Sequence, residues 1–175
     1  MADHRVGLRP FEKTDLEWYV EMLNDPEAVG PHNWNGPREV AEVEKSLAPD
    51  DTGRSGNLVC QLDDGTIIGD VQWRAQRWGP GERSWCPAIG IALLPGYRGL
   101  GYGTAAQRAL VTHLFEALDI TRVEADTAVD NPAEQRALEK AGFAREGIVR
   151  QCEWRDGRWH DHVLYSVLRE DWAAG

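Results

Sequence analysis

Cysteine, long apolar runs and basic charge are all scarce in this chain of 175 residues. Its three cysteines, Cys60, Cys86 and Cys152, are far apart and form no paired spacing, so the sequence indicates neither a disulfide framework nor a zinc site. No apolar stretch approaches the roughly 20 residues that span a bilayer, and the first residues lack the apolar stretch of a secretory signal. We therefore expect a cytoplasmic protein with no membrane partner and no bound metal.

The scarcity of basic residues limits the kinds of partner that the chain can bind. The chain has 19 Lys and Arg against 29 Asp and Glu, a formal net charge of -10. Proteins that bind nucleic acid normally carry a basic footprint, so the composition argues against a nucleic-acid partner. Twelve of the acidic residues lie within residues 1–51, against five basic ones. This acidic third either favours a cationic partner or is a solvated surface.

Apolar periodicity and turn residues predict one mixed α/β domain over residues 1–175. Thr14 and Glu17 form a capping-box pattern, Pro37 suits a first helical position and Gly142 suits a helix C-cap. The turn motifs "DDG", "WGPGE" and "RDG" predict an antiparallel meander and a final hairpin. The expected strands are residues 5–11, 55–62, 66–76, 83–94, 121–129, 143–154 and 158–168, and the expected helices are residues 14–23, 36–48, 104–118 and 131–142.

The stretch "GYRGLGYGTAAQ", residues 96–107, places four glycines at the start of an expected helix. Glycines there allow a ligand close to the backbone, and the helix N-terminus binds phosphate. A Walker loop needs a lysine, and none lies between Lys45 and Lys140. A dinucleotide fingerprint matches Gly101, Gly103 and Ala106, but it should follow the first strand of a parallel sheet, and here a meander precedes it.

Four stretches in order resemble the GNAT superfamily of N-acetyltransferases, and are closest to its RimJ/RimL-like, ribosomal-protein N-terminal acetyltransferase branch. They are "LRPFEKTDLE", "LLPGYRGLGYGTAAQ" with its Arg-x-x-Gly-x-Gly pattern, "DNPAEQRALEKAGF" and "DGRWHDHVLYSVLREDW". The resemblance implies a mixed, mostly antiparallel sheet with a splayed strand pair and flanking helices. It also implies transfer of an acetyl group from acetyl-CoA to a primary amine, by direct attack in a ternary complex.

The resemblance implies the coenzyme contacts as well. Arg98 would bind the diphosphate together with backbone N–H groups of the loop. Gly90 and Pro87 should kink or bulge their strand, and the pantetheine arm would lie along the opened edge. Asn131 corresponds to the pantetheine-contacting asparagine of the family. The local pattern also predicts that Asn131 is a helix N-cap. The remaining expected coenzyme contacts are Ile91, Ala92, Leu93, Gly99, Leu100, Gly101, Tyr102, Gly103 and Thr104.

The expected catalytic residues are Ile91, whose N–H would polarise the thioester carbonyl, Asn131 and Glu134. Glu134 and Leu138 stand where many relatives carry the serine or tyrosine acid, and Ala88 stands where some carry a glutamate base. Since a helix N-terminus lowers the pKa of a carboxyl, we expect Glu134 to cap its helix and not to donate a proton. The expected substitutes for the base are His32, Asp70, Glu82 and Asp126.

The resemblance places residues 24–37 over the acceptor pocket, where we expect His32, Trp34, Trp73 and Trp85 to bind a cationic amine. Trp73 and Trp85 could equally be core residues of their strands. An α-amine with a pKa of about 7.8 needs less help to lose its proton than a lysine with a pKa of about 10.4. A coenzyme A-binding or regulatory module with impaired catalysis is the alternative function, and a homodimer is a candidate assembly.

Overall fold

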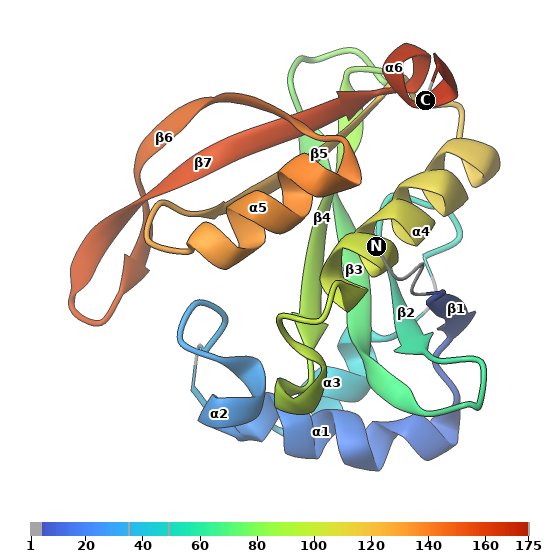
Figure 1. Cartoon of the computed structure of the whole chain (residues 1–175), viewed down its shortest axis with the longest axis vertical. Helices are drawn as coiled ribbons and strands as arrows, with labels where there is room; N and C mark the ends of the chain where they lie inside the picture. The colour runs from blue at the N-terminus through green and yellow to red at the C-terminus, as the bar shows by residue number, and fades with distance from the viewer. Residues whose placement is uncertain (1–4, 35, 49, 175) are drawn as a thin grey trace.

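The computed structural model describes residues 5–34, 36–48 and 50–174. A seven-stranded mixed sheet crosses the molecule in the order β1-β2-β3-β4-β5-β7-β6 (Figure 1). Its pairs are antiparallel except for β4 and β5, which run parallel. The strands are β1 (Gly7–Pro10), β2 (Gly56–Gln61), β3 (Ile67–Arg77), β4 (Trp85–Leu93), β5 (Arg122–Ala128), β6 (Ala144–Arg155) and β7 (Arg158–Leu168).

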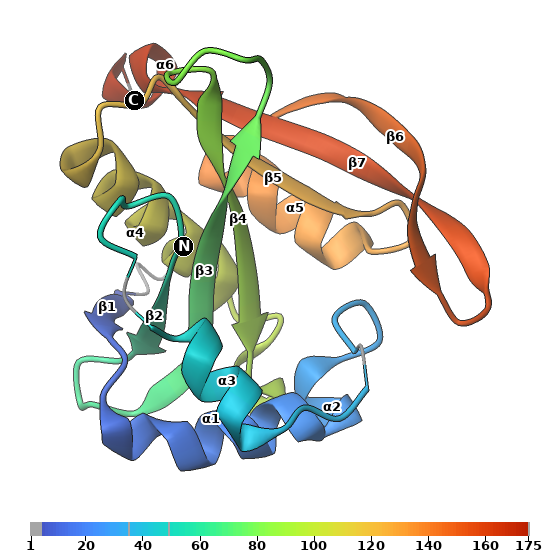
Figure 2. The ribbon, with the colours of Figure 1, turned by 180° about the vertical axis from the view of Figure 1, so that it is seen from behind.

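Helices flank the sheet. Helices α4 and α5 lie in front of it in Figure 1, and α3 lies in front of β3 when the molecule is seen from behind in Figure 2. Helices α1 and α2 cross below one end of β3 and β4. The helices are α1 (Leu16–Asn24), α2 (Pro26–Val29), α3 (Val40–Ser46), α4 (Tyr102–Ala117), α5 (Pro132–Ala141) and α6 (Arg169–Ala174), with 3-10 turns at Lys13–Asp15 and Pro95–Tyr97.

The main core lies between the sheet and α4. The apolar stripe of α4 includes Leu110, Val111 and Leu114, which have no exposed side-chain surface and pack against strand residues such as Val71 and Val123. Burying a side chain of this size is worth about 1.5–3 kcal/mol. This packing fixes α4, and with it the glycine loop that precedes the helix.

Strands β4 and β5 diverge, and their divergence opens the middle of the sheet (Figure 1). They pair only through Ala88 with Glu124 and Ile89 with Ala125. The predicted splayed pair and the α/β fold class are therefore confirmed. The predicted bulge at Gly90 and Pro87 is wrong, because β4 pairs with β3 from Trp85 to Leu93 without a register shift. The opening lies between β4 and β5, and β4 itself carries no bulge.

The first helices differ from the expectation. The box at Thr14 and Glu17 is wrong: Glu12 and Asp15 form the capping box, and Arg9 donates two hydrogen bonds to Asp15, at 2.6 and 2.8 Å. The helix expected from Gly36 begins only at Val40, and the sequence patterns did not predict the short helices α2 and α6. An ion pair between β1 and the turn that precedes α1 thus accompanies the start of the first helix.

Candidate functional site

The glycine loop ends in an open helix N-terminus. Gly101 is the N-cap of α4, with a left-handed φ of 95°, and no side chain caps the helix there. The first N–H groups of a helix have no partner within it, so they face the space in front of α4. A Cβ added at Gly99, where φ is +72°, would meet nothing within 4 Å. The backbone of this loop is therefore accessible to a ligand.

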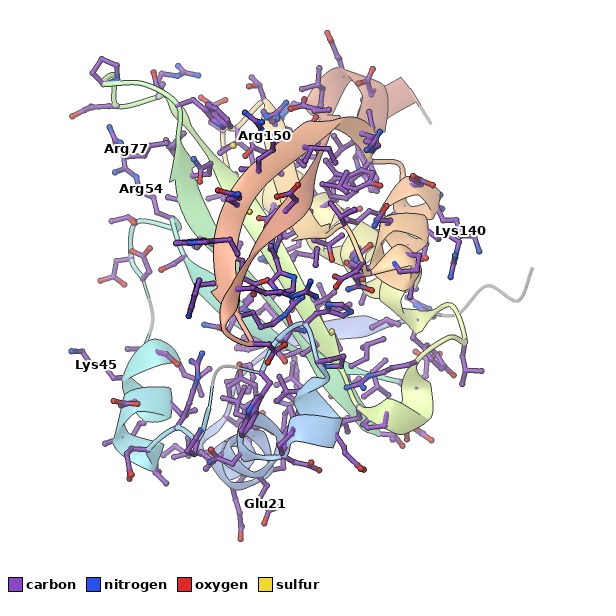
Figure 3. All side chains as sticks on the ribbon, turned by 90° about the vertical axis from the view of Figure 1, so that its left-hand side faces the viewer. Glu21, Lys45, Arg54, Arg77, Lys140 and Arg150 are labelled. Atoms are coloured by element: carbon purple, nitrogen blue, oxygen red, sulfur yellow. The ribbon has the colours of Figure 1, made fainter. Side chains whose placement is uncertain are left out.

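A cavity of about 460 Å³, which we name the loop cavity, lies in front of this helix end. Arg136 and Lys140 of α5 also line it, and sequence patterns did not single them out. Lys140 projects outward from α5 in Figure 3. Of the expected coenzyme contacts, the structure brings the following to the loop cavity: Ile91, Ala92, Leu93, Arg98, Gly99, Gly101, Gly103, Thr104 and Asn131.

Two expected contacts are absent from the residues that line the loop cavity. Leu100 is 54% exposed, and the ring of Tyr102 packs against Tyr97 with 6.0 Å between the ring centroids. Their side chains therefore serve the surface and the packing of the loop. The expectation for these two residues concerned their backbone N–H groups, and it stays a prediction.

Arg98 joins the loop to helix α2. Its guanidinium donates to the carbonyl oxygens of Leu93 at 2.8 Å, Glu27 at 3.2 Å and Ala28. The carbonyls of Glu27 and Ala28 belong to the last turn of α2, where backbone acceptors lack partners within the helix. Arg98 thus holds the loop, the end of β4 and α2 together, and its contact with a diphosphate stays a prediction.

A second cavity of about 460 Å³, the sheet cavity, is lined by residues of α1, β3, β4 and β5, and by Gln107 of α4 and Glu134 of α5. Alternate residues of β3 reach it, as the two-residue period of a strand requires. They are Asp70, Gln72 and Arg74. The two cavities meet at residues that line both: Val29, His32, Asn33, Ile91, Ala92, Asn131 and Glu134.

Asp70 is the most deeply buried acid of the sheet cavity, with 2% of its surface exposed. Tyr19 of α1 donates a hydrogen bond of 3.4 Å to its Oδ2, while its Oδ1 has no partner among the described residues. Burial disfavours the charged carboxylate and raises the pKa of Asp70 to about 7. This acid can therefore take or release a proton near neutral pH.

Glu134 stands where the two cavities meet, on the first turn of α5. Its carboxyl accepts a hydrogen bond from Nε2 of Gln107, a residue of α4 that is 1% exposed. Desolvation raises the pKa of Glu134 to about 7, against the smaller lowering effect of the Gln107 bond. The expectation of a low pKa at this helix N-terminus is wrong, because desolvation raises the pKa of Glu134.

The cap at this helix comes from Asn131 alone. Its side-chain oxygen accepts from the backbone N–H of Glu134 at 3.3 Å, which confirms the predicted N-cap. Its Nδ2 donates to Thr127 Oγ1 at 3.1 Å. The expected capping contribution of the Glu134 side chain is absent, because that carboxyl turns to Gln107. Glu134 is thus left available at the cavity boundary.

At the other end of the sheet cavity, His162 joins two carboxylates. Its Nδ1 lies 2.6 Å from Asp126 Oδ2, and its Nε2 lies 3.0 Å from Glu153 Oε2. The Asp126 bond is the largest cause that raises the pKa of His162, and the same bond lowers the pKa of Asp126. These two carboxylates are therefore already paired, whereas Asp70 has no cationic partner in the part of the chain that the structure describes.

The expected acceptor residues are only partly brought together. His32 lines both cavities, and burial lowers its pKa. Trp34 is absent from the residues that line them. Trp73 donates to the Gly53 carbonyl at 3.0 Å and packs near the ring of His113 on α4.

Trp85 lies under the guanidinium of Arg54, 5.6 Å from its ring centroid, and packs against the main core. Neither Trp73 nor Trp85 is among the residues that line the two cavities, and both pack against the main core, as the alternative expectation for them states. Glu82 is exposed in the turn between β3 and β4, outside both cavities.

The described acidic residues of the first third of the chain lie outside both cavities. No described acidic residue among positions 5–51 lines either cavity. Figure 3 shows Glu21 of α1 pointing away from the rest of the molecule. The cavity carboxylates come instead from later elements: Asp70, Asp126, Glu134 and Glu153. Most of these described acids are exposed to solvent, and Asp15, the buried one, is paired with Arg9.

Comparisons with known proteins agree with this architecture. A model of the acetyltransferase (GNAT) domain matches residues 5–144. The probable N-acetyltransferase YjcK of Bacillus subtilis (strain 168) is 29% identical, over 95% of this chain and 95% of its own length. RimJ of Mycobacterium smegmatis, solved in complex with CoA-disulfide, is 25% identical with a TM-score of 0.80, over 95% of this chain and 83% of that one.

A spermidine N-acetyltransferase of Vibrio cholerae, solved in complex with CoA and spermine, has the same fold. Its TM-score is 0.81 at 20% identity, over 97% of this chain and 98% of that one. In the part of the chain that the structure describes, no group of three His, Cys, Asp or Glu side chains could hold a metal ion. No described helix is long and apolar enough to cross a membrane.

Proposed function

The chain belongs to the acetyltransferase (GNAT) family, and from that premise we propose that it transfers the acetyl group of acetyl-CoA to the α-amine of a peptide or an amino acid. The observation that carries this proposal is the meeting of the two cavities at the opening between β4 and β5. One cavity suits an anionic phosphate ligand, and the other holds an unpaired buried acid. A thioester at the boundary would be accessible to an amine from the other side.

The loop cavity fits the diphosphate of coenzyme A. The N-terminus of α4 offers N–H groups that have no partner within the helix and the positive end of the helix dipole, and the left-handed Gly99 and Gly101 keep side chains out of the way. Arg136 and Lys140 add positive charge on the α5 side. We assign the diphosphate to this loop.

Beyond Ile89, the edge of β4 that faces β5 has no strand partner among the described residues. Backbone N–H groups on such an edge can bond a peptide-like chain, as a neighbouring strand would. We assign the pantetheine arm to residues 91–93 and Asn131, and the N–H of Ile91 to the thioester carbonyl. A donor fixed there stabilises the oxyanion that forms when the amine attacks.

Asp70 is the proposed proton acceptor for the incoming ammonium. With a pKa of about 7, it takes a proton from an α-amine of pKa about 7.8 at a cost of about 1 kcal/mol. The same transfer from a lysine-like amine of pKa about 10.4 costs about 4.6 kcal/mol. The proton affinity of this acid is therefore matched to an α-amine.

No observation favours the alternative function, a coenzyme A-binding or regulatory module with impaired catalysis. It rested on Ala88, Glu134 and Leu138 at the positions where relatives carry a base and an acid. Two carboxyls with pKa values near neutrality, Asp70 and Glu134, line the sheet cavity and can supply both functions.

Two matched peptides test the acceptor. One carries a free α-amine and an acetylated lysine, and the other carries a blocked α-amine and a free lysine. We expect the release of coenzyme A from acetyl-CoA to be at least tenfold faster with the first. Preference for the lysine peptide or for an aliphatic diamine would refute the α-amine proposal, and no turnover with any amine would refute the transferase proposal.

A further inference from the structure

We propose that Glu134 is the proton donor to the sulfur atom of the leaving coenzyme, and that Gln107 is its positioning residue. This inference rests on the proposed function, because it assigns a role within the same acetyl transfer. It gives Glu134, a half-buried carboxyl of the site, a task that Asp70 does not perform.

The position of Glu134 follows from the two cavities. The coenzyme would occupy the loop cavity and the amine the sheet cavity, so the carbon–sulfur bond that breaks must lie at their boundary. Glu134 lines both cavities at that boundary, together with Ile91 and Asn131. One turn later on α5, Leu138 is 1% exposed and belongs to the core, so it cannot supply a proton. Glu134 is the residue of α5 that lines both cavities and carries an exchangeable proton.

Gln107 holds this carboxyl in place. Its side chain is almost completely buried between α4 and α5, and its Nε2 donates to Oε1 of Glu134. Its own Oε1 has no hydrogen-bond partner among the described residues, although Gln107 lines the sheet cavity. A buried amide oxygen without a donor costs about 1–3 kcal/mol, so the bound substrates should supply one. This acceptor, on a residue that lines the sheet cavity beside Glu134, is where an N–H or O–H of the bound substrates would arrive.

Two carboxyls are enough to balance the protons of the acetyl transfer. The ammonium first gives one proton to the Asp70 carboxylate, and the neutral amine then attacks the acetyl carbon, forming the carbon–nitrogen bond. As the carbon–sulfur bond breaks, its electron pair goes to sulfur, which takes the proton of the Glu134 carboxylic acid. The nitrogen of the adduct returns its extra proton to the Glu134 carboxylate. The products are the acetylated amine, the thiol of coenzyme A and one proton on Asp70, which passes to water.

The transfer therefore needs Asp70 ionised and Glu134 protonated. Burial brings both pKa values to about 7, so each condition is met by part of the molecules at neutral pH. The rate should fall below pH 7 as Asp70 takes up a proton and above pH 7 as Glu134 loses one.

Other ionisable or charged groups also line the two cavities. In the sheet cavity they are Tyr19, His32, Arg38, Arg74, Asp126, Glu153 and His162, and in the loop cavity they include Arg98, Arg136 and Lys140. The test therefore compares the two limbs of the pH profile between variants, so that each limb is assigned by the substitution that removes it.

The experiment measures kcat against pH for the parent, Glu134→Gln, Asp70→Asn and the control Glu139→Gln, an exposed glutamate of the same helix. We expect Glu134→Gln to lower kcat about 100-fold, to lose the alkaline limb and to keep the parent dissociation constant for coenzyme A. Asp70→Asn should lose the acidic limb, and Glu139→Gln should match the parent.

A second variant keeps the test independent of how Glu134→Gln folds. The bond from Gln107 lowers the pKa of Glu134, so Gln107→Met should move the alkaline limb to higher pH. If Glu134→Gln keeps kcat within threefold and retains the alkaline limb, this inference is wrong while the proposed function stands. If the parent protein acetylates no amine, the proposed function fails and this inference fails with it.

Discussion

Replacing Asp70 with asparagine keeps the shape of the side chain and removes its ability to take up a proton. If Asp70 is the proton acceptor, kcat/KM for an α-amine should fall by about 100-fold or more, because general bases contribute about 10²–10⁴-fold. The hydrogen bond from Tyr19 at 3.4 Å can be kept by the amide oxygen. The loss should therefore lie in the chemical step, with the coenzyme affinity unchanged.

The same substitution should stabilise the fold at alkaline pH. Burial raises the pKa of Asp70 from 3.8 to about 7, so between these values the unfolded chain has released a proton that the folded chain still holds. Stability therefore falls as pH rises through this window. The shift of about 3 pKa units corresponds to at most about 4 kcal/mol. Asp70→Asn removes this penalty, and its advantage over the parent should be largest at pH 8 and absent at pH 4.

Urea unfolding at pH 4, 6 and 8 measures the stability, and coenzyme A release measures the activity. Asp63→Asn, at an exposed turn position, is the control that should change neither. Equal pH dependence of the unfolding free energy in Asp70→Asn and the parent would show that Asp70 is not the buried acid described above. Retained activity would remove it from the mechanism. A variant that is more stable at pH 8 and less active would support the trade of stability for function at this position.

Three further outcomes follow from the site. Gly101→Val should abolish the thermal stabilisation by coenzyme A, because a side chain would enter the loop at a left-handed φ of 95°, and a retained shift would refute the diphosphate assignment. Asn131→Ala should cost about 0.5–2 kcal/mol of stability through the lost cap and should weaken acetyl-CoA binding more than Glu134→Gln does, as isothermal titration would show. Raising the ionic strength should lower kcat/KM more for cationic than for neutral amines, since the net charge is -10, and equal salt sensitivity would leave the charges without a steering role.

Local patterns in the sequence predicted the elements and the loop well. The period of two in the central strands and the apolar stripe of the helix over residues 104–118 are local signals, and the meander, α4 and α5 follow them closely. The glycines of residues 96–107 and the cap at Asn131 are local too, because a helix N-terminus is built from neighbours in the chain. The family and the class of ligand could be inferred from these patterns.

The acid–base groups were decided by tertiary structure. Asp70 meets Tyr19 across 51 positions, and Glu134 meets Gln107 across 27, so neither burial nor partner is a property of the local sequence. A pKa shift depends on how much water is excluded around a carboxyl, which is set by the packing of α1, α4 and α5. For the same reason, the side of the sheet to which Trp73 and Trp85 turn followed from strand register and core packing. The sequence by itself determined where the glycine loop lies, and only the folded chain decided which side chains line the sheet cavity.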